Sequence, residues 1–257
     1  MYEHIIEFQI DGAVCTIVMN RAEKRNAVDR HMANALRDAF LRFEADDTLR
    51  VAVLTAAGDT FCAGADLAAV GNAEKMNELD PDGGGAGPMG PTRMSLTKPL
   101  IAAISGHAVA GGLELALLAD LRVADETAIF GVFCRRWGVP LIDGGTVRLP
   151  RLVGMGRALD MILTGRAVDA AEALQMGLVN RVVARGTARE AAEQLARQLA
   201  TFPQRCMLAD RASAYRQWDL PVDTALRQEG ARGTRIVFEE GLAGAARFVA
   251  GAGRHGA

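Results

Sequence analysis

A single carboxylate interrupts an apolar helix pattern directly after two adjacent glycines. From Leu113 to Ala119 every residue except Glu114 is apolar, which predicts a helix that is buried on all sides and holds one ionisable group. Burial raises the pKa of a carboxyl group toward neutrality, and such a group suits general acid or base catalysis. The alternative is a core helix whose glutamate reaches solvent or pairs with an arginine.

The two glycines before this carboxylate, Gly111 and Gly112, indicate a site for negative charge. Glycine lets another segment approach the backbone closely, and a helix start leaves N–H groups free where the helix dipole favours an anion. We therefore expect an acid/base group and anion-binding donors within one helical turn.

Composition excludes several classes of function. The 257 residues are 50% apolar and 23% charged, with a formal net charge of −2, as in an ordinary soluble protein of one large or two small domains. This balance argues against nucleic acid as a main partner. No apolar run reaches the length of a membrane span, and residues 1–4 lack a signal-peptide pattern, so we expect a cytoplasmic protein without membrane contact. The cysteines lack metal-ligand spacing, so we expect free thiols and no metal site.

Strand and helix patterns alternate around the glycine–glutamate stretch. Asp11-Gly12 predicts a hairpin, Asp29 is a helix-cap candidate, and the Gly- and Pro-rich residues 71–95 predict a mobile substrate loop. The expected strands are residues 3–11, 13–19, 51–55, 98–104, 121–124 and 128–130.

The second half of the chain is predominantly helical. Residues 155–164 have helical spacing, and capping boxes at Asp169 with Glu172 and at Thr187 with Glu190 begin two further helices around a short strand at 179–183. Residues 203 to about 250 are helix-rich, without a repeat or linker. These helices belong to the same fold or form a subunit contact.

Five motifs follow one another along the chain, at residues 20–27, 61–67, 98–116, 144–149 and 164–181. Together they resemble the crotonase (enoyl-CoA hydratase/isomerase) superfamily over nearly the whole chain. The resemblance implies an α/β fold with a ββα-superhelix spiral core at residues 1–200 that binds an acyl-CoA thioester. It further implies a C-terminal helical trimerisation region at residues 201–257, giving a homotrimer or a hexamer built as a dimer of trimers. Coenzyme A is then part of the substrate, and no separate cofactor is expected.

The resemblance also assigns roles to particular residues. The backbone N–H groups of Ala65 and Gly111 would form an oxyanion hole for the thioester enolate, where each donor contributes roughly 3–4 kcal/mol. Arg25 is a candidate phosphate contact, or else a solvated loop charge. The residues that correspond to coenzyme A contacts are Lys24, Arg25, Asn26, Ala27, Ala63, Asp66 and Leu67.

The chain departs from the hydratase pattern at the second catalytic glutamate. Glu114 occupies the position of the first glutamate, but counting back from Gly144 places Cys134 in the slot of the second. Cys134 is a small filler, which we favour, or a thiolate whose pKa is lowered by a neighbouring arginine. Trp137 is a candidate pocket residue that packs against an acyl group, with a core role as the alternative.

Asp143 is a candidate for the missing second carboxylate. It lies where hydratases commonly have a small residue, and members of the superfamily that isomerise dienoyl-CoA or displace a ring halide have a catalytic aspartate near that place. Its alternative role is a cap for the helix that begins at Gly144.

Three functions compete. The first is an enoyl-CoA hydratase-like lyase in which Glu114 handles a proton or water. The second is an enoyl- or dienoyl-CoA isomerase, or a C–C hydrolase acting on a CoA ester, that uses Asp143. The third is a non-catalytic CoA-binding subunit, because the usual second acid is absent. An RNA-binding relative is disfavoured by the acidic balance. No motif identifies the acyl group.

Overall fold

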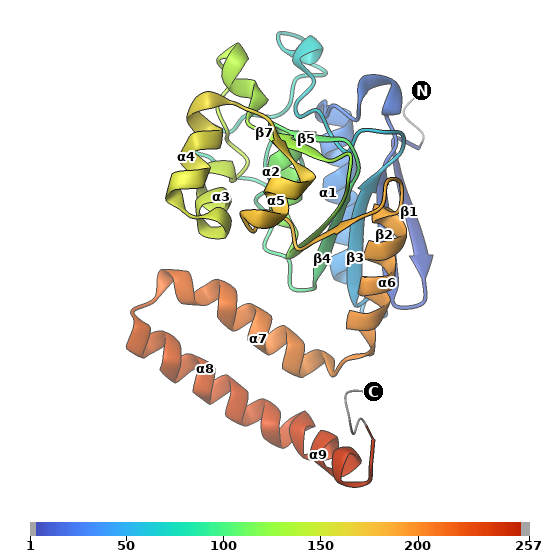
Figure 1. Ribbon diagram of the computed structural model, residues 1–257, viewed down its shortest axis with the longest axis vertical. Helices are drawn as coiled ribbons and strands as arrows, with labels where there is room; N and C mark the ends of the chain where they lie inside the picture. Colours follow the sequence, from blue (N-terminus) through green and yellow to red (C-terminus); the bar gives the residue numbers. More distant parts are fainter. Residues whose placement is uncertain (1–3, 253–257) are drawn as a thin grey trace. The chain divides into compact units, whose positions relative to one another are not determined.

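The computed structural model describes residues 4–252 and divides after Arg197 into two compact units, which we describe separately (Figure 1). Residues 1–3, part of the expected first strand and of the N-terminal sequence considered above, lie outside the described residues. So do residues 253–257 of the expected trimerisation region. The expectation that residues 201–257 mediate oligomerisation stays a prediction.

A six-stranded sheet forms the centre of the first unit. Its order is β1-β2-β3-β4-β6-β9; β1 and β2 pair antiparallel, and every other pair is parallel. The predicted hairpin is confirmed, with Gly12 in the turn at a φ of +57°. The strands are β1 (Ile6–Asp11), β2 (Val14–Met19), β3 (Val51–Ala56), β4 (Leu100–Ile104), β6 (Leu121–Asp125) and β9 (Arg181–Val183).

Helix α1 (Arg30–Ala45) begins at the predicted cap. The Asp29 carboxylate accepts a hydrogen bond of 3.0 Å from the N–H of Met32, which satisfies one of the free donors at the helix start. Its side chains Leu36, Phe40 and Phe43 are fully buried in the core. Burial of each such side chain stabilises the fold by about 1.5–3 kcal/mol.

A second sheet has three short strands, and the first of them directly precedes the glycine–glutamate helix in the sequence. It joins β5 (His107–Val109), β7 (Ile129–Gly131) and β8 (Val168–Asp169) in the order β5-β7-β8. Helix α2 (Gly111–Leu118) follows β5 after one residue, and all eight of its residues are buried. The short turn η2 (Leu67–Ala69) is followed by irregular backbone up to β4, as predicted for residues 71–95.

Helices complete the first unit. The predicted helix 155–164 is α4 (Met155–Thr164), and α5 (Ala170–Gln175) is capped by Asp169, which accepts a hydrogen bond of 2.8 Å from the N–H of Glu172. The remaining elements are η1 (Ala22–Lys24), η3 (Phe133–Trp137) and α3 (Gly145–Val153). Helix α6 (Ala188–Thr201) begins in this unit and continues past Arg197. Across residues 4–252, no helix has the length and apolar character needed to cross a membrane.

The second unit consists of helices that bury no side chain over their described lengths. Glu239 forms ion pairs with Arg205 and Arg235, at 3.0 and 2.7 Å. Both pairs are exposed, so they contribute little to stability. The elements are α7 (Gln204–Arg216), η4 (Gln217–Asp219), α8 (Val222–Ile236), η5 (Val237–Gly241) and α9 (Leu242–Val249).

Candidate active site

Two backbone segments meet where the sequence predicts an anion site. The N–H of Cys62 donates to the carbonyl of His107 at 2.9 Å, and the N–H of Val109 donates back to the carbonyl of Cys62 at 3.1 Å. A Cβ atom at Gly112 would lie 2.1 Å from that same Cys62 carbonyl oxygen. The close approach of the two segments therefore requires glycine at position 112.

The backbone N–H groups of Ala65 and Gly111 are the free donors at this meeting point. Across residues 4–252 neither N–H has a hydrogen-bond acceptor. A Cβ atom on Gly64, which has a φ of +99°, would lie 3.1 Å from the Gly111 nitrogen, so the residue before Ala65 adjoins the start of α2. Free N–H groups at a helix start attract negative charge; their role as an oxyanion hole stays a prediction.

Ala110 sets the direction in which this helix begins. It has a φ of +54° and a ψ of −125°, a backbone conformation that residues with a side chain rarely adopt. Its N–H donates to the carbonyl of Gly131 at 2.9 Å, and its carbonyl accepts from the N–H of Glu114 at 3.2 Å. These bonds hold a strained residue in place directly before the Gly111 N–H.

Glu114 is buried and held through one carboxylate oxygen. Its Oε1 accepts hydrogen bonds of 2.8 Å from the N–H groups of both Asp143 and Gly145. Only 2% of the residue is exposed. Burial is the main cause that raises the pKa of Glu114 to about 7; the Gly145 N–H lowers it, and the negative charge of Asp143 raises it further. No donor among the described residues binds Oε2, so this oxygen is the one available to a substrate proton or water.

Asp143 lies beside Glu114 through its backbone, and its carboxylate points to a different segment. Its Oδ1 accepts a 3.0 Å hydrogen bond from the N–H of Met89 and a short one from the hydroxyl of Thr92. Burial raises the pKa of Asp143, and the bonds from Thr92 and Met89 oppose that effect. The alternative role as a helix cap is wrong, because Gly144 precedes α3 at a φ of +97° and no side chain caps that helix.

The contact of Met89 with Gly111 was missed by sequence reasoning. A Cβ atom at Gly111 would lie 2.6 Å from the Met89 sulfur, and Met89 is only 1% exposed. The thioether therefore packs directly on the residue whose N–H is a candidate oxyanion donor. Met89 lies in the irregular segment, where no periodic pattern indicates which side chains face the site.

Cys134 adjoins Glu114, and its thiol is held in the neutral form. Burial and the negative charge of Glu114 both raise the pKa of Cys134, so the thiolate alternative is wrong. Trp137 is 72% exposed at the end of η3, so it is not a core residue of this chain. Its contact with an acyl group stays a prediction.

The two segments expected to contact coenzyme A lie next to each other. The N–H of Ala63 donates to the carbonyl of Arg25 at 3.1 Å, and the Val28 N–H donates to the Gly64 carbonyl at 2.8 Å. Asn26 is fully buried and its amide group donates to two loop carbonyls, at 2.9 and 2.7 Å. The Asn26 side chain therefore shapes the loop.

Other side chains of these segments divide between internal and outward-facing positions. The Asp66 carboxylate caps η2 and pairs with Arg21 at 2.9 Å. The exposed side chains are Lys24, Arg25 and Leu67, whereas Ala27 and Ala63 are half-buried.

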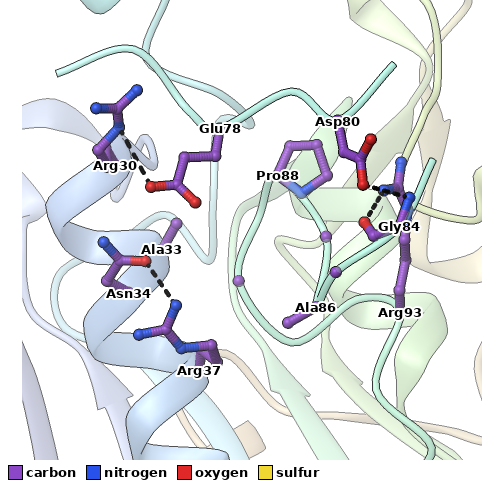
Figure 2. A pocket seen from close by; sticks show the side chains of 13 residues that line it. Arg30, Ala33, Asn34, Arg37, Glu78, Asp80, Gly84, Ala86, Pro88 and Arg93 are labelled. Atoms are coloured by element: carbon purple, nitrogen blue, oxygen red, sulfur yellow. Dashed lines mark hydrogen bonds and ion pairs between the residues drawn. The ribbon is translucent and has the colours of Figure 1, made fainter. Parts of the chain in front are cut away.

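A cavity of about 200 Å³ lies between α1 and residues 78–93 (Figure 2). Gly87 and Gly90 line it, whereas neither Glu114 nor Asp143 does. The cavity is therefore separate from the site, although the turn that contains Gly87 and Gly90 takes part in both. Its charged and amide side chains belong to Arg30, Asn34, Arg37, Glu78, Asp80 and Arg93. No cluster of three metal-ligating side chains occurs within the described chain.

The fold and site define an α/β protein that combines two free backbone N–H groups at a helix start with a buried carboxyl pair. The sequence model of the enoyl-CoA hydratase/isomerase family matches residues 9–232. The chain belongs to this family, and it is an acyl-CoA-processing enzyme of the crotonase type. The predicted family and fold class are therefore confirmed.

Curated relatives and solved structures agree with the family assignment. Carnitinyl-CoA dehydratase of Proteus mirabilis is 40% identical over 191 residues, which cover 74% of this chain and 72% of that protein. The structure of an enoyl-CoA hydratase from Mycobacterium tuberculosis matches with a TM-score of 0.88 at 31% identity, covering 95% and 96% of the two chains. A carnitinyl-CoA dehydratase structure from Mycobacterium avium matches with a TM-score of 0.77 at 35% identity, covering 88% and 91%.

Proposed function

We propose that this protein adds water to a 2-enoyl-CoA, or removes it from a 3-hydroxyacyl-CoA. The observation that carries the proposal is Glu114: a buried carboxyl group with a pKa of about 7, held by two backbone N–H groups on the helix that begins at Gly111. Relatives named carnitinyl-CoA dehydratase support a reaction that gains or loses water.

The thioester oxygen accepts hydrogen bonds from the N–H groups of Ala65 and Gly111 in the proposed reaction. Water oxygen bonds to C3, the C2–C3 π electrons move toward the thioester, and the developing enolate charge is stabilised by these donors. A proton then reaches C2 and collapses the enolate. This step needs one group that takes a proton from water and one that gives a proton to C2.

Glu114 and Asp143 divide these two roles in the proposal. Glu114 has a pKa of about 7 and so retains its proton over much of the neutral range; it donates the proton to C2. Asp143 accepts the proton from water; burial raises the pKa of its carboxyl group, and the donors from Thr92 and Met89 and the nearby charges of Arg93 and Arg148 oppose that effect. Two carboxyl groups in different environments can divide the acid and the base roles between them.

A double-bond isomerase is the second candidate function, and Cys134 is the observation that favours it. The residue in the slot of the second hydratase glutamate is a neutral thiol beside Glu114. Moving a double bond needs proton transfer between two carbons and no activated water, so a carboxyl pair without that glutamate suffices. A C–C hydrolase acting on a CoA ester is the further enzymatic alternative from the sequence.

The conversion of crotonyl-CoA tests the proposal, and the loss of its conjugated absorbance measures the rate. Glu114→Gln removes the proton donor, so kcat/KM falls by at least about 100-fold, while the exposed control Glu126→Gln keeps the wild-type rate. Failure to hydrate 2-enoyl-CoA of any chain length would refute hydration. Migration of a deuterium label in 3-enoyl-CoA without water addition would identify the isomerase, and unchanged rates in Glu114→Gln would show that this carboxyl group takes no part in the reaction.

Binding and assembly complete the proposal. Coenzyme A binds along the adjoining segments at 24–27 and 63–67, where Lys24 and Arg25 have exposed side chains. The second unit forms a homotrimer or hexamer through its exposed apolar side chains. Four free cysteines fit a reducing compartment such as the cytoplasm.

A further inference from the structure

A carboxylate of the proposed acid/base pair is bonded by a loop more than 50 residues away in the sequence. Asp143 is 3% exposed and Thr92 is 0% exposed. The Thr92 hydroxyl and the Met89 N–H both donate to Oδ1 of Asp143. No donor among the described residues binds Oδ2. The loop therefore fixes one carboxylate oxygen and leaves the other for a reacting group.

The surrounding loop is built to keep this arrangement. Arg148 donates from one guanidinium nitrogen to the Asp143 carbonyl at 3.1 Å and from the other to the Thr92 carbonyl at 2.7 Å, which ties the two backbones together. A Cβ atom at Gly87, where φ is +108°, would lie 2.2 Å from the Thr92 hydroxyl oxygen and 3.0 Å from Oδ1. Only glycine at position 87 leaves room for the hydroxyl–carboxylate bond.

We propose that Thr92 is a positioning residue that orients Asp143 and favours its ionised form for its role as base. This inference rests on the proposed function for its catalytic consequence. A hydrogen bond donated to a carboxylate favours the charged form, and here it opposes the desolvation that burial imposes. The charged groups that act on Asp143 are Arg93 from the loop, Arg148 from α3 and Glu114 from α2.

The first measurement is independent of turnover. Titration of the Asp143 carboxyl carbon is followed by ¹³C NMR, with the signal assigned by its loss in Asp143→Asn. In Thr92→Val the pKa of Asp143 rises by about one unit, because the donor is gone and the volume is kept. Thr92→Ser, which retains the hydroxyl, titrates like wild type. Thr92→Ala serves in place of the valine variant where that variant does not fold.

Thr97→Val is the matched control. Its hydroxyl also donates to a carboxylate, that of Glu44 at 2.6 Å, on an exposed surface outside the site. Thr97→Val leaves the Asp143 titration and the rate unchanged. An Asp143 pKa that is unmoved in both Thr92→Val and Thr92→Ala overturns the inference.

The second measurement is the pH dependence of kcat/KM for crotonyl-CoA. In Thr92→Val the acidic limb moves up by about one pH unit, which is about tenfold in rate below both pKa values. In the Asp143→Asn background, Thr92→Val changes nothing further. A decrease in kcat/KM that is equal at every pH overturns the positioning role. A decrease that adds to the one caused by Asp143→Asn also overturns it. An enzyme with no turnover refutes the proposed function, while the NMR titration still decides the Thr92–Asp143 link.

Discussion

Glu114 is a carboxyl group that becomes a weaker acid when the chain folds. Its pKa rises from 4.5 to about 7, chiefly through burial. Below pH 4.5 the folded and unfolded forms both hold the proton. Between pH 4.5 and 7 only the folded form holds it, so the free energy of unfolding falls as the pH rises and levels off above 7.

The Glu114→Gln variant lacks this titration and should show a flatter dependence of stability on pH. Between pH 4.5 and 8 its free energy of unfolding should rise by roughly 3 kcal/mol relative to that of the wild type, because each pKa unit of difference between the folded and unfolded states is about 1.4 kcal/mol. Urea unfolding at several pH values measures the difference, with Glu126→Gln as the exposed control. Parallel stability curves for wild type and Glu114→Gln would contradict the raised pKa.

Single residues differ in how far the sequence revealed their surroundings. The burial of Glu114 followed from its apolar neighbours on one helix, which is a local pattern. The direction of the Asp143 carboxylate did not, because its partners Met89 and Thr92 lie in an irregular segment 54 and 51 residues earlier. Contacts across such a separation depend on the path of the loop, and residue spacing does not encode that path.

At the scale of elements, the turn of residues 87–90 lies against the start of α2. The buried Met89 thioether contacts Gly111, beside the proposed position of the thioester. If the acyl chain extends along this contact, the volume of Met89 limits its length. In an apolar pocket, one methylene group contributes about 1–3 kcal/mol to the discrimination between two substrates.

Met89→Ala should therefore shift substrate preference toward longer chains. We expect the ratio of kcat/KM for decenoyl-CoA to that for crotonyl-CoA to rise at least about tenfold. Met161→Ala removes the same volume from a fully buried position in α4 and should lower stability without altering the ratio. Equal effects of the two variants on chain-length preference would rule out Met89 as a length determinant.

Elements with local signals were predicted well, and elements made by long-range pairing were not. The caps at Asp29 and Asp169 and the hairpin at Gly12 were all confirmed, since each depends on residues within one turn. The three-stranded sheet was missed as a unit, because strands of two or three residues such as β8 contain too few side chains to show alternation.

At the scale of the whole molecule, the second unit leaves large apolar side chains exposed. Phe238 and Leu242 are 69% and 59% exposed, and helices α7, α8 and α9 bury no side chain. A unit with this surface is expected to pack on another copy of the chain. The family resemblance predicted oligomerisation, although no local pattern fixes the number of copies.

Charged substitutions on this surface should reduce the size of the assembly. Phe238→Glu and Leu242→Glu each place a charge where an apolar contact is proposed, so light scattering coupled to size exclusion should detect smaller particles. Gln228→Glu adds the same charge at an exposed polar position of α8 and should leave the particle mass unchanged. A wild-type protein that is already monomeric would exclude the trimer and the hexamer.

Ala110 has a consequence for how the catalytic apparatus tolerates sequence change. Its φ of +54° costs about 1–3 kcal/mol in a residue that has a side chain. Glycine would relieve that cost, but it would also widen the range of backbone directions open to the chain before Gly111. Alanine thus exchanges some folding stability for a fixed direction of the donor N–H, and bulkier side chains at position 110 would lose both.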